Sequence, residues 1–296
     1  MTMLDHPAFA LPTTVAEAVH ALNRRPGAAY VAGGTELMPD LAWGTASPAG
    51  FVSLRHVAEL RGVTGGQGVP AAVRVGATTT IAGLLADSGA ALEERALPGL
   101  ARAAESLGTP QVRTQATVGG NVMSALPYRN LLPVLLATGA SVELTGRDGV
   151  RVLPFDGFVT APGRTLALPG ELLSAILVPR AAGYQDYVKV GPRNAQFVAT
   201  ASAAIAVDAA AGTVRFGFGN AADVPLRLPA ADEVAAQALA ARPDPASAAE
   251  ALGELADVVA GGVDPPADHV ASAEYRRHAL GVLARRLLER AMGGTP

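Results

Sequence analysis

Residues 115–126 read QATVGGNVMSAL, and they place two adjacent glycines, Gly119 and Gly120, after a short β-prone run. A second stretch, VAGGTEL at residues 31–37, repeats this order of a β-prone run, a glycine pair and a small polar residue. Glycine adopts positive φ without strain and lacks a Cβ, so a ligand can approach its backbone closely. Successive free amides in such a loop form a concave surface that suits phosphate oxygens. A single loop of this kind is usually a tight turn, whereas two of them predict a diphosphate held between two parts of the chain.

The sequence around the first loop indicates a small α/β unit. Residues 13–25 have apolar side chains at helical spacing, with a threonine to cap the start and a Pro-Gly pair to end the helix. Short strands are expected at residues 28–34 and 51–55, and a brief helical turn follows the glycine pair. We therefore assign residues 1–56 to an N-terminal unit.

A second unit, residues 57–182, contains the other glycine pair between further strands and helices. Its strands are expected at residues 73–81, 117–122, 140–146 and 171–179. Its helices are expected at residues 81–88 and 96–108. Each unit thus carries one glycine pair, and a ligand between the units would be held by both.

The pattern changes again in residues 183–296. Strands are expected at residues 187–191, 197–208 and 213–219. Helices are expected at residues 231–241, 245–262 and 271–291. The arginines of the last helix, Arg276 among them, are interpreted as a solvated face. The sequence therefore predicts an α+β fold in three parts, of which the last is a three-stranded sheet with a helical bundle.

The composition argues against several classes of function. A net charge of -3 over 296 residues argues against nucleic-acid binding, which uses basic stripes. The absence of cysteine excludes disulfides, thiolate-held zinc and iron–sulfur ligation by this chain. The five histidines show no ligand spacing, so no metal site is expected. We find no pattern of a secretory signal or a transmembrane segment, and we expect a cytoplasmic protein.

The two glycine pairs occur within a longer ordered series of segments. Neither pair fits a G-x-G-x-x-G fingerprint or a P-loop with its lysine, which disfavours a Rossmann dinucleotide site and an ATPase. The series runs VAGGTELMPDL, RVGATTTIAGLL, LGTPQVRTQATVGGNVMSALPYRNLLPVLLATGASVEL, YVKVGPRNAQFVATASAAIAV and SAEYRRHALGVLARRLLERA. In this order, and over nearly the whole chain, it resembles the FAD-binding medium subunit of the molybdenum hydroxylases, the family of xanthine dehydrogenase and carbon monoxide dehydrogenase.

The resemblance implies a two-part FAD-binding domain of the p-cresol methylhydroxylase type, followed by the three-stranded sheet with its helical bundle. It also implies that both glycine loops contact non-covalently bound FAD, with His56 a surface residue rather than a covalent flavin link. The residues carried over from the two loops are Val31, Ala32, Gly33, Gly34, Thr35, Glu36, Thr117, Gly119, Gly120 and Asn121. Trp43 is expected to pack beneath the first loop.

Three further residues are implied as cofactor contacts. Asn130 stands where xanthine dehydrogenase-like members have an acidic residue, so a ribose or adenosine-side contact there would lack its charge. Leu173 falls at an apolar contact position, and a plain core leucine is an equally open interpretation. Lys189 matches a lysine near the flavin ring, and it is the only lysine among the 23 lysine and arginine residues. Because an ammonium is not interchangeable with a guanidinium, this favours a functional lysine that stabilises the reduced flavin.

The resemblance implies an electron carrier with no catalytic residue of its own. A large subunit with a molybdenum cofactor and a small subunit with two [2Fe-2S] clusters are the implied partners, in a dimer of heterotrimers. Electrons would pass from the clusters through FAD to NAD+, a quinone, a carrier or dioxygen. Two alternatives stay open: a stand-alone flavin oxidoreductase of the same superfamily, and a non-catalytic assembly subunit that has lost FAD.

Overall fold

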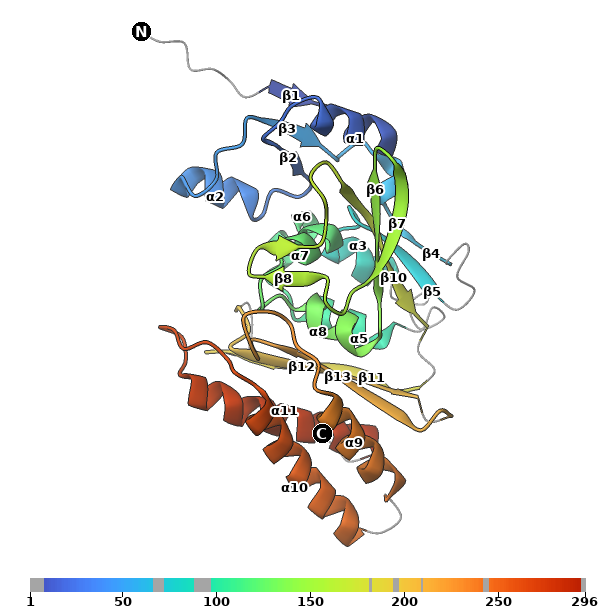
Figure 1. The fold of residues 1–296 in the computed structure, drawn as a ribbon, viewed down its shortest axis with the longest axis vertical. Coiled ribbons are helices and arrows are strands. Elements are labelled where there is room, and N and C mark those ends of the chain that lie inside the picture. The colour runs from blue at the N-terminus through green and yellow to red at the C-terminus, as the bar shows by residue number, and fades with distance from the viewer. Residues whose placement is uncertain are drawn as a thin grey trace.

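The computed structural model describes residues 8–65, 72–87, 97–180, 183–193, 197–208, 210–241 and 245–293. Three parts follow one another along the longest axis of the molecule, each built on its own β-sheet (Figure 1). The fold is α+β, as the sequence predicts.

The first part is a small parallel sheet with a covering helix. Its elements are β1 (Ala8–Ala10), α1 (Val15–Asn23), β2 (Ala28–Val31), α2 (Leu37–Trp43) and β3 (Gly50–Ser53). The strands lie in the order β1-β3-β2, so β2 is an edge strand that leads directly into the first glycine loop. Helix α1 begins where Thr14 and Glu17 form a capping box, and it buries Ala18 and Val19 in the core of this part.

The second part is a five-stranded antiparallel sheet in the order β4-β5-β10-β6-β7, with short helices packed against it. Its elements are η1 (Ala58–Leu60), β4 (Val63–Gly65), β5 (Ala72–Gly76), α3 (Ile81–Asp87), α5 (Pro98–Glu105), α6 (Pro110–Gln115), α7 (Val118–Met123), α8 (Leu131–Ala137), β6 (Ser141–Gly146), β7 (Gly149–Pro154), β8 (Val159–Ala161), β9 (Arg164–Thr165) and β10 (Leu172–Pro179). Helix α8 is buried along its whole length, because it packs against α5 and α7 and also against the sheet of the third part.

The third part is an antiparallel meander, β11-β12-β13, followed by three helices. Its elements are β11 (Gln185–Val190), β12 (Ala201–Asp208), β13 (Thr213–Gly219), α9 (Pro229–Ala240), α10 (Pro245–Gly262) and α11 (Ala273–Ala291). Helices α9 and α11 pack on this sheet, and α5 and α8 of the second part also pack on it. Helices of the second and of the third part thus cover the sheet, and its central strand β12 is apolar and buried at most positions.

The second and third parts meet where backbone touches backbone. A Cβ on Gly217 of β13 would overlap the carbonyl oxygen of Pro133 in α8. A Cβ on Gly219 would lie 3.0 Å from the carbonyl oxygen of Pro127. Glycine at these positions therefore lets the sheet of the third part lie directly on the second part.

Residues 117–122, expected to be a strand, lie almost wholly in helix α7. Thr117 is the N-cap of this helix, and its Oγ1 accepts a hydrogen bond of 3.0 Å from the amide of Gly120. The amide of Gly119 donates to the carbonyl oxygen of Ala77 at 2.7 Å. The Thr117 cap and this bond to the turn after β5 therefore hold the segment as a helix instead of a paired strand. The propensity of residues 117–122 does not reveal this contact, because Ala77 is distant in sequence.

Two large side chains also lie elsewhere than expected. Trp43, expected to pack beneath the first glycine loop, is 77% exposed at the end of α2, a helix that buries none of its residues. Arg276, expected on a solvated face of the last helix, is only 1% exposed. Its charge is compensated by Asp268, which accepts two hydrogen bonds of 2.8 Å. Asp268 lies in the loop before the helix, so the helical pattern alone does not show the pair.

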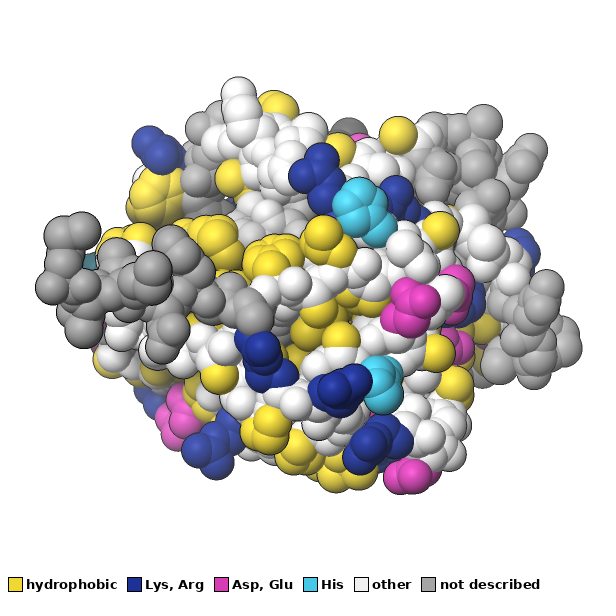
Figure 2. All heavy atoms as spheres, turned by 90° about the horizontal axis from the view of Figure 1, so that it is seen from above, with side chains coloured by type: hydrophobic (Ala, Val, Ile, Leu, Met, Phe, Trp, Pro, Cys, Tyr) yellow, Lys and Arg dark blue, Asp and Glu magenta, His cyan; other side chains and the backbone are white. Residues whose placement is uncertain are grey.

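Among the described residues, no helix combines the length and apolarity needed to cross a membrane. Figure 2 looks along the long axis onto the first part of the chain. On that face, basic, acidic and histidine side chains are interspersed among the residues drawn.

We expect Gly217→Ala to destabilise the fold, because the added methyl would force β13 away from α8. Overpacking of this kind costs about 1–3 kcal/mol, and each kcal/mol lowers Tm by about 2–4 °C in a chain of this size. Gly253→Ala in α10 is the matched control, since nothing lies within 4 Å of its added Cβ. We expect Gly253→Ala to leave Tm unchanged or to raise it, because alanine has a higher helix propensity than glycine. Equal Tm values for the two variants in calorimetry would contradict the close approach.

Candidate functional site

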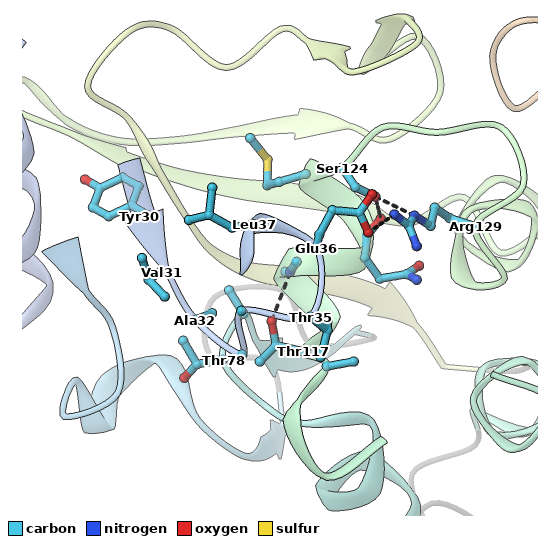
Figure 3. Close-up of a pocket in the computed structure, with 18 of the residues that line it drawn as sticks. Tyr30, Val31, Ala32, Thr35, Glu36, Leu37, Thr78, Thr117, Ser124 and Arg129 are labelled. Carbon is cyan, nitrogen blue, oxygen red and sulfur yellow. Dashed lines mark hydrogen bonds and ion pairs between the residues drawn. The ribbon is translucent and has the colours of Figure 1, made fainter. Parts of the chain in front are cut away.

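A cavity of about 580 Å³ lies between the first and second parts, and the start of the third part closes one side of it. Its lining includes every cofactor residue expected from the sequence except Lys189. These lining residues are Val31, Ala32, Gly33, Gly34, Thr35, Glu36, Thr117, Gly119, Gly120, Asn121, Asn130 and Leu173. The fold thus brings the loop after β2, helix α7 and strand β10 to one site (Figure 3).

The first glycine loop lines the cavity with unpaired backbone amides. Gly34 has a φ of +70°, a conformation that favours glycine. A Cβ on Gly33 would overlap the carbonyl oxygen of Gln115, so the loop packs directly on the end of α6. Among the described residues, the amides of residues 33–37 donate no hydrogen bond within the chain. The loop therefore offers a run of free donors beside the cavity.

The second glycine loop contributes close packing rather than free amides. The amides of Gly119 and Gly120 already donate to Ala77 and to the Thr117 hydroxyl. A Cβ on Gly119 would lie 2.7 Å from the Cβ of Ala77, so this glycine lets α7 approach β5. The Cβ added at Gly120 would meet only Thr117 Oγ1, at 3.0 Å, and Gly120 is exposed. Gly120 therefore keeps the cavity open, and the expected phosphate-binding amides belong to the first loop alone.

An ion pair joins two sides of the cavity. Glu36 of the first loop and Arg129, between α7 and α8, point toward one another and form a salt bridge (Figure 3). Arg129 Nε also donates to Ser124 Oγ at 2.8 Å, and its guanidinium lies 5.1 Å from the ring centre of Tyr128. Burial raises the pKa of Tyr128, which stays neutral. The sequence patterns did not single out Arg129, because its partners come together only in the fold.

Asn130 is a buried side chain with a fixed orientation. Its Nδ2 donates to Ser106 Oγ at 2.8 Å and to the carbonyl oxygen of Ala103 at 3.5 Å. Among the described residues, no hydrogen bond uses its Oδ1. Because the amide group is committed to these acceptors, Asn130 offers the cavity an acceptor, as a carboxylate would.

Strand β10 and Glu171, the residue before it, supply a wall that combines apolar and charged residues. Leu173 is 3% exposed and belongs both to the core of the second part and to the cavity lining. Glu171, also in the lining, accepts hydrogen bonds of 2.6 Å and 2.8 Å from Arg151. These hydrogen bonds lower the pKa of Glu171, so the carboxylate stays ionised at neutral pH. The sequence patterns did not indicate Glu171 as a lining residue.

Lys189 lies beside the cavity rather than in its lining. Its Nζ donates to the carbonyl oxygens of Ser106, at 2.6 Å, and of Phe197, at 2.9 Å. Burial lowers the pKa of this lysine. Phe197 lines the cavity and Ser106 precedes the lining residue Leu107, so the ammonium stands behind the cavity wall. His56 is exposed and outside the lining, and the described residues contain no cluster of potential metal ligands.

Comparisons with protein families cover almost the whole chain. Residues 5–181 match the model described as the FAD binding domain in molybdopterin dehydrogenase. Residues 186–291 match the model of the CO dehydrogenase flavoprotein C-terminal domain. The two matches meet between β10 and β11.

Relatives and solved structures agree with these matches. The chain is 30% identical to the xanthine dehydrogenase FAD-binding subunit of Escherichia coli O157:H7, over 98% of this chain and 97% of that protein. It is 31% identical to the carbon monoxide dehydrogenase medium chain of Afipia carboxidovorans, over 95% and 94% of the two chains. A structure of reconstituted CO dehydrogenase from Oligotropha carboxidovorans superposes with a TM-score of 0.86 at 27% identity, over 99% and 100% of the chains. The chain therefore belongs to the family of FAD-binding medium subunits of the molybdenum hydroxylases, oxidoreductases of the xanthine and carbon monoxide dehydrogenase type.

Proposed function

We propose that FAD binds non-covalently in this cavity, with its diphosphate against residues 33–37 and Arg129. The run of amides without acceptors in the first loop is the observation that carries the proposal. Partly buried amides need acceptors, and phosphate oxygens are strong ones. The Arg129 guanidinium adds a charged donor at the same place. The residues present therefore fit the phosphate part of FAD.

The remaining lining fits the other parts of the cofactor. Apolar side chains from all three parts, among them Leu54, Leu173 and Phe197, line the cavity. Such walls suit planar rings, and the volume lies within the range of about 300–1,000 Å³ that is typical of cofactor sites. The Oδ1 acceptor of Asn130 suits a ribose or adenosine-side donor. We propose Val31, Ala32, Thr117 and the other lining residues named above as the cofactor contacts.

The FAD supplies the capacity to take up and release electrons, while the chain binds it and sets its surroundings. We propose that electrons arrive from the [2Fe-2S] clusters of a small partner subunit, and that a large partner subunit carries the molybdenum cofactor. NAD+, a quinone, a carrier or dioxygen would be the final acceptor. The lack of cysteine in this chain supports clusters on another chain.

We further propose an arrangement for the chain and its assembly. Three sheets, each with a buried cluster of side chains centred on it, support a division into residues 1–56, 57–182 and 183–296, and Leu172, Tyr187 and Ala204 pack across its boundaries. A dimer of heterotrimers in the cytoplasm is the assembly that the family suggests.

The FAD content of the purified chain tests the proposal that the cavity binds FAD: we expect a yellow protein from which acid releases one FAD per chain. A folded, colourless chain that refuses added FAD would instead support the assembly-subunit alternative.

We expect Gly120→Val to lose FAD while the protein stays folded, because the side chain would enter the cavity. We expect FAD affinity to fall by at least about tenfold, which corresponds to at least about 1.4 kcal/mol of binding free energy. Flavin titration and calorimetry measure the two effects separately. Gly119→Val is the variant for comparison. Its side chain would collide with Ala77, so we expect it to lower Tm in addition to any loss of FAD. Stoichiometric flavin in a folded Gly120→Val protein would refute the assignment.

We expect Asn130→Leu to weaken FAD binding by about tenfold, because the acceptor beside the cavity is lost. Asn130→Asp keeps an acceptor at the cavity. The Ser106 hydroxyl, which donates to the carbonyl oxygen of Ala103, can turn to donate to the new carboxylate, so the FAD affinity stays within about threefold of the wild type. Titration of the FAD-free chain with FAD measures both. If Asn130→Asp were the weaker binder, the orientation of the amide described above would be wrong.

We propose that the charge of Lys189 favours the reduced, more negatively charged form of FAD. Lys189→Met then lowers the midpoint potential by on the order of 30 mV, equivalent to about 1.4 kcal/mol for a two-electron couple. The loss of FAD binding free energy is smaller than this, although Lys189 also bonds to the carbonyl oxygen of the lining residue Phe197. Lys189→Arg retains the positive charge and is the control. Spectroelectrochemical titration measures the midpoint potential of each variant. Equal shifts of the potential in Lys189→Met and Lys189→Arg would show that the charge is not the cause.

A further inference from the structure

One wall of the cavity comes from the third part of the chain. Phe197 and Val198 line the cavity, although they immediately precede the strand β12 of that part. Phe197 is 38% exposed and Val198 is 55% exposed. Side chains this exposed are not fixed by core packing, so the backbone that carries them must be held by other contacts. We call residues 197–200 the wall segment.

Buried polar side chains hold the carbonyl groups of the wall segment. Asn220 Nδ2 donates to the carbonyl oxygen of Ala199 at 2.6 Å and to that of Thr200 at 3.2 Å. Arg276 Nε donates to the same Thr200 oxygen at 3.1 Å. The amide of Thr200 donates to the carbonyl oxygen of Val190 at 2.8 Å. The position of the wall segment thus depends on side chains that lie outside the cavity.

Asn220 also connects the wall segment to a second stretch of the cavity lining. Its φ of +55° is a left-handed conformation that asparagine tolerates better than most residues. In this conformation its amide donates to the carbonyl oxygen of Pro127 at 2.9 Å. Pro127 precedes Tyr128 and Arg129, which line the cavity. One residue therefore ties two walls together.

Arg276 is oriented by a pair of fixed acceptors. The carboxylate of Asp268 accepts two bonds of 2.8 Å from Nη2, and the carbonyl oxygen of Pro266 accepts from Nη1. Hydrogen bonds, the largest effect being that from Arg276, lower the pKa of Asp268 to about 2, so this carboxylate is ionised at neutral pH. A guanidinium held in this way presents Nε to Thr200 in one orientation, which a lysine could not reproduce.

We propose that Asn220 and Arg276 are positioning residues that set where Phe197 and Val198 stand against the bound cofactor. The inference rests on the proposed function, since it needs FAD in the cavity. It extends the site to helix α11, because Arg276 belongs to that helix and does not line the cavity. The third part of the chain would then determine the surroundings of the cofactor through backbone carbonyls.

Asn220→Gly tests this in the full-length chain. Glycine keeps the positive φ and the amide bond to Pro127, and it removes only the side chain that holds the wall segment. We expect the FAD dissociation constant to rise about threefold to tenfold, and the visible circular dichroism of bound FAD to change. Asp268→Asn is a second variant in case the first does not fold, since Asp268 is 41% exposed. It weakens the orientation of Arg276 and should act in the same direction.

Arg277→Met is the matched control on the same helix. Arg277 pairs at the surface with Asp264, which is 94% exposed, and it makes no bond to the wall segment. We expect this variant to bind FAD with the constant and the spectrum of the wild type. A change in Tm without a change in the flavin signals would indicate a merely structural role for any of these residues.

A double-mutant cycle with Phe197→Ala separates action through the wall from general destabilisation. If Asn220 acts through Phe197, Asn220→Gly changes the flavin signals much less in the Phe197→Ala protein than in the wild type. Additive effects would overturn the proposal, as would wild-type FAD affinity and spectrum in both Asn220→Gly and Asp268→Asn. Failure of the wild-type chain itself to bind FAD would overturn the proposed function instead.

Discussion

The close approach of the first glycine loop to the end of helix α6 is the contact on which the cavity depends. Gly33 has no room for a Cβ against the carbonyl oxygen of Gln115. The stretch that begins at Gln115 is in turn fixed to the second part, because the amide of Gly119 bonds to Ala77 at 2.7 Å. The first part is thereby held at one distance from the second. The free amides of residues 33–37 come to lie at a cavity rather than at an open surface.

Two glycine pairs with the same sequence pattern serve different physical needs. In the first loop, Gly34 provides a left-handed turn and the neighbouring amides stay free for a ligand. In the second, Gly119 provides a close helix–strand contact, and Gly120 leaves space for the ligand. Positive charge is supplied separately by Arg129, which is paired with Glu36 across the cavity. The diphosphate proposal therefore rests mainly on the first loop, and the second loop shapes the space.

The elements and lining residues that could be predicted are those with a local signal. Helical spacing, glycine pairs and the resemblance between ordered segments sufficed for most helices and for twelve of the residues that line the cavity. Helix α7 (Val118–Met123) was expected as a strand, because its start depends on bonds to a turn that is distant in sequence. Arg129 was missed, and Arg276 was placed in solvent, because their acceptors, Glu36 and Asp268, meet them only in the folded chain. Sequence periodicity describes which face of an element is apolar, and it does not identify the partners of a buried charge.

The cavity is the place where all three parts of the chain meet, and this makes cofactor binding and folding interdependent. The second and third parts already touch through Gly217 and Pro133. The first part reaches the second through the loop at Gly33, the Glu36–Arg129 ion pair, a bond of 3.2 Å from Asn23 to Gly170, and the packing of Leu172 in its core. A ligand that binds only the folded cavity stabilises it by about 2.7 kcal/mol at a hundred times its dissociation constant. The backbone contacts at Gly217 and Gly219 lie outside the cavity lining. A loss of stability on removing FAD would therefore fall first on the contacts across the cavity, which join the first part and the segment at Phe197 to the second part.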